Sequence, residues 1–125
     1  MQVGKAARLF AAKALWQATG LRSAGRTLVR ALGSPDDDLR TLAGMFLVQG
    51  GKKAAPLLDE ALARREHLPM VLTLLADLGD PRYEPALRAF AADPDPAVAE
   101  SARQALKVLA HAHGAAAAAN ASPGA

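Results

Sequence analysis

The sequence predicts an all-α protein, a short right-handed α-solenoid of about three antiparallel helical hairpins plus a leading helix. The first observation is that the chain nearly repeats itself about every 30 residues, a length typical of stacked helical hairpins. Segment 79–87 aligns with segment 50–58, placing Gly on Gly, Arg on Lys, Pro on Pro and Leu on Leu. The second is composition: Ala and Leu dominate and only five residues are aromatic, which favours helix over strand.

The first two helices are predicted over residues 4–19 and 24–33. Apolar residues recur every three or four positions in both segments. Gly20 suits a left-handed helix end, and Gly33 stops the second helix. The residues expected to face inward are Leu9, Ala12, Trp16, Leu28, Ala31 and Leu32.

The next pair of helices is predicted over residues 36–49 and 53–64. Ser34 is expected to cap the first of them, and the aspartates that follow oppose its positive dipole end. Gly50 and Gly51 separate the two helices. The expected inward residues are Leu39, Leu42, Ala43, Phe46, Leu47, Leu58, Ala61 and Leu62.

Three further helices are predicted over residues 67–78, 82–92 and 96–112. Pro85 stands in the first turn of the middle one, as Pro56 does one repeat earlier. Residues 113–125 are of low complexity, with an alanine run and no large apolar side chain. We therefore expect residues 113–125 to be a disordered tail.

Charge is unevenly distributed along the chain, and this distribution suggests that the N-terminal segment is distinct from the repeat domain. Six basic residues and no acidic residue precede Asp36. We expect residues 1–23 to form a basic helix or half repeat, and residues 24–112 to form the repeat domain. The basic end is either a solvated end helix or a contact for nucleic acid or an anionic membrane, through Lys5, Arg8, Lys13, Arg22, Arg26 and Arg30.

Two motifs resemble the short HEAT-like repeats of bacteria, a repeat type also found in phycobilin lyases. They are Gly79-Asp80-Pro81-Arg82-x-x-Pro85-Ala86-Leu87 and Asp95-Pro96-x-Val98-x-x-x-Ala102-x-x-Ala105-Leu106. The resemblance covers residues 20–110 and implies an armadillo-like helical stack that serves as a scaffold or regulator. It also leaves open a small-ligand protein similar to a bilin lyase.

The sequence predicts no catalytic residue, metal site or cofactor. Without cysteine there is no thiolate nucleophile or thiolate zinc ligand. His111 and His113 are two positions apart, so on a helix their imidazoles point about 200° from each other. The serines have no suggestive His–acid partner, and no glycine-rich phosphate loop is present.

The function expected is therefore a non-enzymatic adaptor or regulatory module that binds another protein or peptide on a concave helix face. No segment is apolar enough to span a bilayer and no secretory signal is recognisable, so a cytoplasmic location is expected. A homodimer or a C-terminal segment could cover the same face instead. The residues predicted to contact the partner are Met45, Met70, Thr73, Leu74, Arg103 and Lys107.

Overall fold

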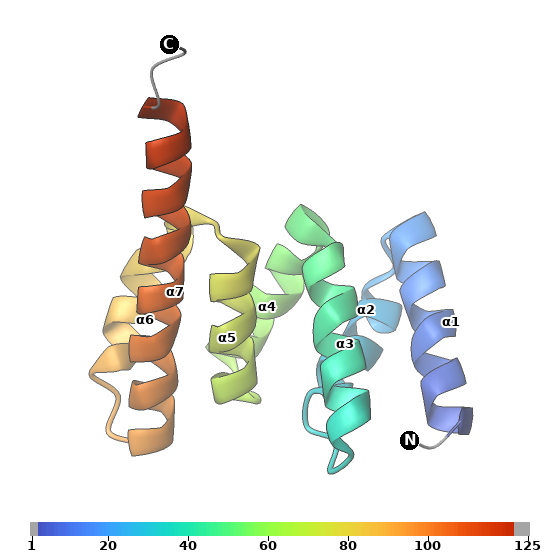
Figure 1. The fold of residues 1–125 in the computed structure, drawn as a ribbon. Helices are drawn as coiled ribbons and strands as arrows, with labels where there is room; N and C mark the ends of the chain where they lie inside the picture. The colour runs from blue at the N-terminus through green and yellow to red at the C-terminus, as the bar shows by residue number, and fades with distance from the viewer. Residues whose placement is uncertain (1–2, 122–125) are drawn as a thin grey trace. The chain divides into compact units, whose positions relative to one another are not determined.

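The computed structural model describes residues 3–121, and over that range it contains helices and no strand (Figure 1). This confirms the all-α class. In chain order the elements are α1 (Val3–Thr19), α2 (Arg22–Ala31), α3 (Asp37–Gln49), the 3₁₀ helix η1 (Gly51–Ala54), α4 (Ala55–Ala63), α5 (Leu68–Leu78), the 3₁₀ helix η2 (Pro81–Tyr83), α6 (Glu84–Ala91) and α7 (Pro96–Ala121).

Most helix ends fall within two residues of those predicted, but α4 and α6 each follow a short 3₁₀ turn that the sequence did not reveal. Pro56 and Pro85 then stand in the first turn of these helices, where a missing N–H costs nothing. Gly20 and Gly79 have φ values of 72° and 70°, so both adopt the left-handed conformation that a glycine tolerates best. The prediction of a left-handed end at Gly20 is confirmed.

Ser34 does not cap α3, and that prediction is wrong. The cap is Asp36, whose carboxylate accepts a hydrogen bond from the Asp38 backbone N–H at 2.9 Å. The Ser34 hydroxyl instead accepts a hydrogen bond from the Asp36 backbone N–H at 3.1 Å, which fixes the turn before the helix. Both short polar side chains thus satisfy backbone donors, and the cap itself lies two positions further along the chain than expected.

The last helix is longer than predicted. It was expected to end at residue 112, yet α7 continues through Ala121. Alanine is the best helix former, so the alanine run from Ala115 to Ala119 prolongs the helix without needing a packed face. Residues 122–125 of the predicted tail lie outside the described residues.

The chain divides into two compact units, residues 1–71 and residues 72–125, which we describe separately. In the N-terminal unit α1 packs against α2 and α3, and α2 also contacts α4. Figure 1 shows α1 and α3 side by side, with α2 behind them. In the C-terminal unit α6 packs along the first part of α7.

The core is aliphatic and follows the predicted repeat. Leu28, Leu58 and Leu87 occupy equivalent repeat positions, and all three are completely buried. The equivalent set of Trp16, Phe46 and Leu75 is also buried, so the inward position expected for Trp16 is confirmed. Among the described residues no polar or charged residue is buried. Burial of apolar surface is therefore the main source of stability in both units.

Trp16 is the largest buried side chain of the N-terminal unit, and two glycines make room for it. A Cβ at Gly50 would lie 2.3 Å from Trp16 Cη2, and a Cβ at Gly25 would lie 3.1 Å from Trp16 Cδ1. Gly50 has φ −69°, a value that any residue can adopt. A glycine is therefore required there by the close contact with Trp16 and not by the backbone conformation. The indole ring thus packs against backbone at both positions.

We predict that Gly50→Ala destabilises the protein by roughly 1–3 kcal/mol, because the added methyl displaces a buried ring in a filled core. Gly4→Ala is the matched control, since nothing lies within 4 Å of a Cβ at that position. It should leave stability unchanged or raise it by up to about 1 kcal/mol through helix propensity. Chemical denaturation measures both, and equal effects would show that the Trp16 contact with Gly50 is unimportant.

Candidate functional site

The predicted partner-binding residues are only partly exposed. Met45 is 50% exposed, Thr73 is exposed, and Met70 is half-buried. Leu74, however, is only 4% exposed, so the expectation that it lies on an exposed stripe is wrong. The reason is that α5 is apolar around most of its circumference and buries more than one stripe.

Arg103 and Lys107 lie on α7 in the C-terminal unit. The Arg103 guanidinium donates to the Glu100 carboxylate at 2.9 Å and to the Ala91 carbonyl, at the end of α6, at 3.4 Å. Hydrogen bonds from Gln104 and Arg103, together with the charges of Arg103 and Lys107, lower the pKa of Glu100. Arg103 thus joins α7 to α6, whereas Lys107 is exposed beside a hollow of about 510 Å³.

The exposed surface of α3 carries apolar side chains at intervals of three residues. Leu42 and Val48 are half-buried, and Met45 between them is exposed. The neighbouring Phe46 is covered by α1, since the Phe10 ring meets it edge-on at 5.0 Å between centroids. Lys13 Nζ lies 4.5 Å from the centroid of the same Phe46 ring, a cation–π contact. We call Leu42, Met45 and Val48 the Met45 surface.

The six basic residues of the N-terminal end lie on two helices, three on α1 and three in one row on α2. Lys5, Arg8 and Lys13 belong to α1, where the first two are exposed. The other three recur every fourth residue of α2, so they share one face of that helix: Arg22, Arg26 and Arg30. The sequence prediction did not recognise the α2 row, because it began this helix at residue 24 and so left out Arg22.

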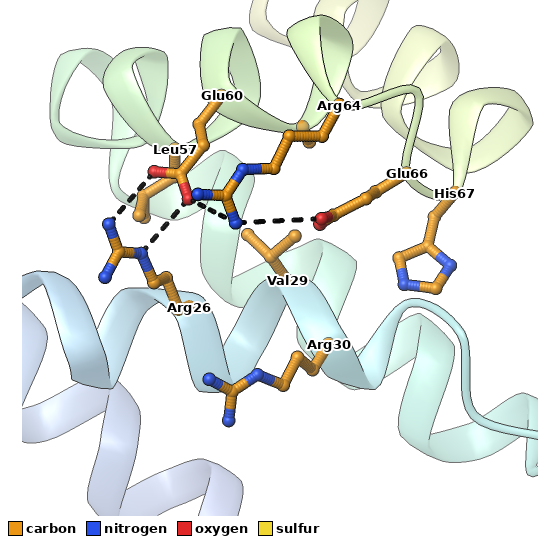
Figure 2. Close-up of a pocket in the computed structure, with 9 residues that line it drawn as sticks. Arg26, Val29, Arg30, Leu57, Glu60, Arg64, Glu66 and His67 are labelled. Atoms are coloured by element: carbon orange, nitrogen blue, oxygen red, sulfur yellow. Dashed lines mark hydrogen bonds and ion pairs between the residues drawn. The ribbon is translucent and has the colours of Figure 1, made fainter.

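Arg26 and Arg30 of the α2 row line an open pocket of about 240 Å³ in the N-terminal unit (Figure 2). Arg26 Nε and Nη2 donate to the two oxygens of Glu60 at 3.2 and 3.3 Å. Arg64 Nη1 lies 3.3 Å from Glu60 Oε1 and 3.9 Å from Glu66 Oε1. Arg30 also lines the pocket, and among the described residues it forms no hydrogen bond or ion pair with this network. Both carboxylates of the pocket are thus paired with arginine.

Glu60 is held in its charged form. The hydrogen bond from Arg26, followed by the charges of Arg26, Arg64 and Arg22, lowers the pKa of Glu60, and partial desolvation opposes them. Because the pKa is lower in the folded state, this carboxylate contributes stability at pH values above its unfolded pKa. That contribution is lost as the pH falls through the folded-state pKa.

The loop between α4 and α5 forms one wall of the pocket and contains two non-glycine residues with positive φ, Arg65 at 54° and His67 at 49°. The Glu66 N–H donates to the Ala61 carbonyl at 2.9 Å and the Arg65 N–H to the Leu62 carbonyl at 3.1 Å. This is the Schellman pattern, with arginine where glycine is usual. The sequence prediction placed the end of this helix within one residue, but it did not reveal the Schellman conformation, because the usual glycine is absent.

No group of three or more His, Cys, Asp or Glu residues within the described residues is placed to hold a metal ion. His111 is exposed on α7, and the side chain of His113 lies outside the described residues. The His67 imidazole lies against Gly33, where an added Cβ would come within 2.8 Å of Nδ1. No helix in the described range has the length and apolar character needed to cross a membrane.

Comparison of the chain with protein-family models, curated proteins and solved structures gave no match.

We predict that Arg26→Ala raises the pKa of Glu60, because the first cause of its lowering is removed. Stability should also change less between acidic and neutral pH than it does in the unaltered protein. Carboxyl NMR titration and denaturation at several pH values measure the two effects. Arg88→Ala, which breaks the separate pair with Glu84, should leave the Glu60 titration unchanged. An unaltered Glu60 pKa in Arg26→Ala would contradict the assignment.

We further predict that Leu74→Asp destabilises the protein by at least about 3 kcal/mol, because it places an unpaired charge in an apolar environment. Thr73→Asp, at the adjacent exposed position, should change stability by no more than about 1 kcal/mol. Thermal and denaturant unfolding distinguish the two variants. If the Leu74→Asp protein folds with an unchanged melting temperature, the conclusion that Leu74 is a core residue is wrong.

Proposed function

We propose that the chain is a non-enzymatic interaction module built from HEAT-like repeats, with about three antiparallel hairpins and a leading helix. Burial at positions one repeat apart supports this architecture. Leu39, Leu68 and Val98 are buried in equivalent places, and so is the second set, Ala43, Leu72 and Ala102. Repeats of this kind commonly present helix faces to partners rather than catalytic groups.

The observation that carries the proposal is the exposure of Met45. It is half exposed on a helix whose Leu39, Phe46 and Leu47 are buried, so it is not needed to fill the core. Leu42 and Val48 extend the apolar strip on either side of it. An apolar strip left open on a folded helix marks an interaction surface more often than a packing error.

The partner is an apolar or amphipathic peptide segment that covers the Met45 surface. Methionine suits this role because its unbranched, polarizable side chain adapts to different partners. Met70, half-buried at the start of α5, is a second candidate anchor within the N-terminal unit. Full burial of one such side chain contributes up to about 1.5–3 kcal/mol before the cost of ordering the partner.

The rival function, a small-ligand protein similar to a bilin lyase, would use the pocket of Figure 2. Proton transfer there would require a carboxylate free to change its charge. Glu60 and Glu66 are both paired with Arg64, and Glu60 is also paired with Arg26. These pairs favour a structural role for the two carboxylates, as a link between α2 and α4, over a catalytic one. The interaction module is therefore the better supported function.

We predict that Met45→Asp abolishes partner capture while the melting temperature stays within a few degrees of that of the unaltered protein. Affinity capture from the native cell, read out by mass spectrometry, identifies proteins retained by the unaltered chain. Val108→Asp is the matched control, because Val108 is 47% exposed but lies in the C-terminal unit. Hydrogen exchange on the reconstituted complex should show protection of α3. Equal capture by Met45→Asp and the unaltered protein would reject this surface.

A further inference from the structure

Helix α1 has two apolar stripes. Within the described residues one of them is covered, and the other is exposed apart from the edge contact of Phe10 with Phe46. The covered stripe packs against α2 and α3 and consists of Ala6, Leu9, Ala12 and Trp16. The second stripe recurs every three or four residues on the solvent side. We call it the outer face of α1, and all its members are exposed: Val3, Ala7, Phe10, Ala11, Ala14, Leu15 and Ala18.

A surface helix normally places polar residues opposite its buried stripe, because water solvates them there. The outer face of α1 departs from this pattern. Val3 is 83% exposed, Phe10 53% and Leu15 46%. Folding leaves about half or more of each of these side chains in water, so a surface that removes them from water would gain hydrophobic free energy.

The charges beside the outer face are all positive. Arg8 lies three and seven residues before Ala11 and Leu15, and therefore on the same edge of the helix. Lys13 follows Phe10 by three residues and borders the opposite edge. Lys5 precedes Leu9 by four residues and Ala12 by seven, so it lies on the side of the covered stripe; α1 contains no acidic residue. Whatever covers this face must therefore tolerate, or supply, negative charge.

We propose that the outer face of α1 lies on an anionic membrane surface. Val3, Phe10 and Leu15 enter the boundary between headgroups and acyl chains, with the helix parallel to the bilayer. Arg8 at one edge and Lys13 at the other meet anionic headgroups. Apolar burial combined with attraction to anionic lipid is how interfacial amphipathic helices bind.

The same residues argue against other occupants. A second copy docked through this face by two-fold symmetry would bring one cationic rim against another. Nucleic acid would engage the cations through its phosphates but would leave Phe10 and Leu15 in water. A protein partner that binds a helix ordinarily supplies a shaped groove. A fluid lipid interface accepts the convex side of a single helix without one.

This inference goes beyond the proposed interaction module and does not depend on it. The outer face belongs to α1, whereas the Met45 surface belongs to α3. The two sites can therefore be tested separately. Together they would describe a module that holds a partner segment close to a membrane.

The test is co-sedimentation of the full chain with vesicles of phosphatidylcholine alone or mixed equally with phosphatidylglycerol. We expect the chain to bind the anionic vesicles at low salt and to dissociate as salt rises, because salt screens surface charges. Equal binding to both vesicle types, or no binding to either at low salt, would overturn the proposal.

Variants distinguish membrane docking from simple charge attraction. Leu15→Asp and Arg8→Glu should each weaken binding to anionic vesicles by about tenfold or more. Val108→Asp is the matched control, because its exposure of 47% nearly equals that of Leu15. Circular dichroism should show that all variants remain helical. Vesicle binding by Leu15→Asp and Arg8→Glu at the level of the unaltered chain would also overturn the proposal.

Two further measurements identify a different occupant. Binding to duplex DNA that is tighter than vesicle binding and insensitive to Leu15→Asp would assign the face to nucleic acid. A dimer in sedimentation equilibrium that Leu15→Asp dissociates would assign it to a second copy. Either result overturns membrane docking. Met45→Asp should retain vesicle binding, so failure of the α3 partner site and failure of membrane docking are distinguishable.

Discussion

The short helices of this protein depend on each other for their existence. Helices α2, α4, α5 and α6 contain 10, 9, 11 and 8 residues. Isolated helices shorter than about 12–15 residues are marginal in water, because nucleating a helical turn is unfavourable. Complete burial of Leu28 in α2, Leu58 in α4 and Leu87 in α6 compensates for this. Each leucine stripe therefore stabilises both the helix that carries it and the packing of its unit.

Helix α1 depends less on tertiary packing for its stability than the shorter helices do. At 17 residues it is longer than the other helices of its unit, and its stripe ending at Trp16 already anchors it to α2 and α3. Of the bulky residues on its outer face, Phe10 touches Phe46 by one ring edge and stays half exposed, and Val3 and Leu15 are exposed as well. They also offer a surface for unwanted association, which a purely structural helix would avoid with polar residues. Their persistence on the exposed side is thus better explained by a contact than by folding.

The repeat made much of the fold predictable from the sequence. Aligning the chain with itself placed Leu39, Leu68 and Val98 in one class, and all three are buried. The same reasoning failed at Leu74, because a helix that is apolar on several sides has no periodic signal to fix its exposed face. The pairing of Arg26 with Glu60 was also missed, since 34 residues separate them and only packing of α2 against α4 brings them together.

The basic N-terminal end shows why a charge count differs from a charged surface. Six basic residues precede the first acidic residue, and this count alone suggests one strongly positive patch. Helix phase assigns half of them to the α2 row, where Arg26 is bound to Glu60 and Arg22 adds to the field that keeps Glu60 ionised. Lys13 is partly engaged with the Phe46 ring. Of the cations on α1, Lys5 and Arg8 therefore contribute most to long-range attraction, and a moderate charge of this kind needs adjacent apolar surface to produce stable binding. On α1 the cations and the apolar residues occur together.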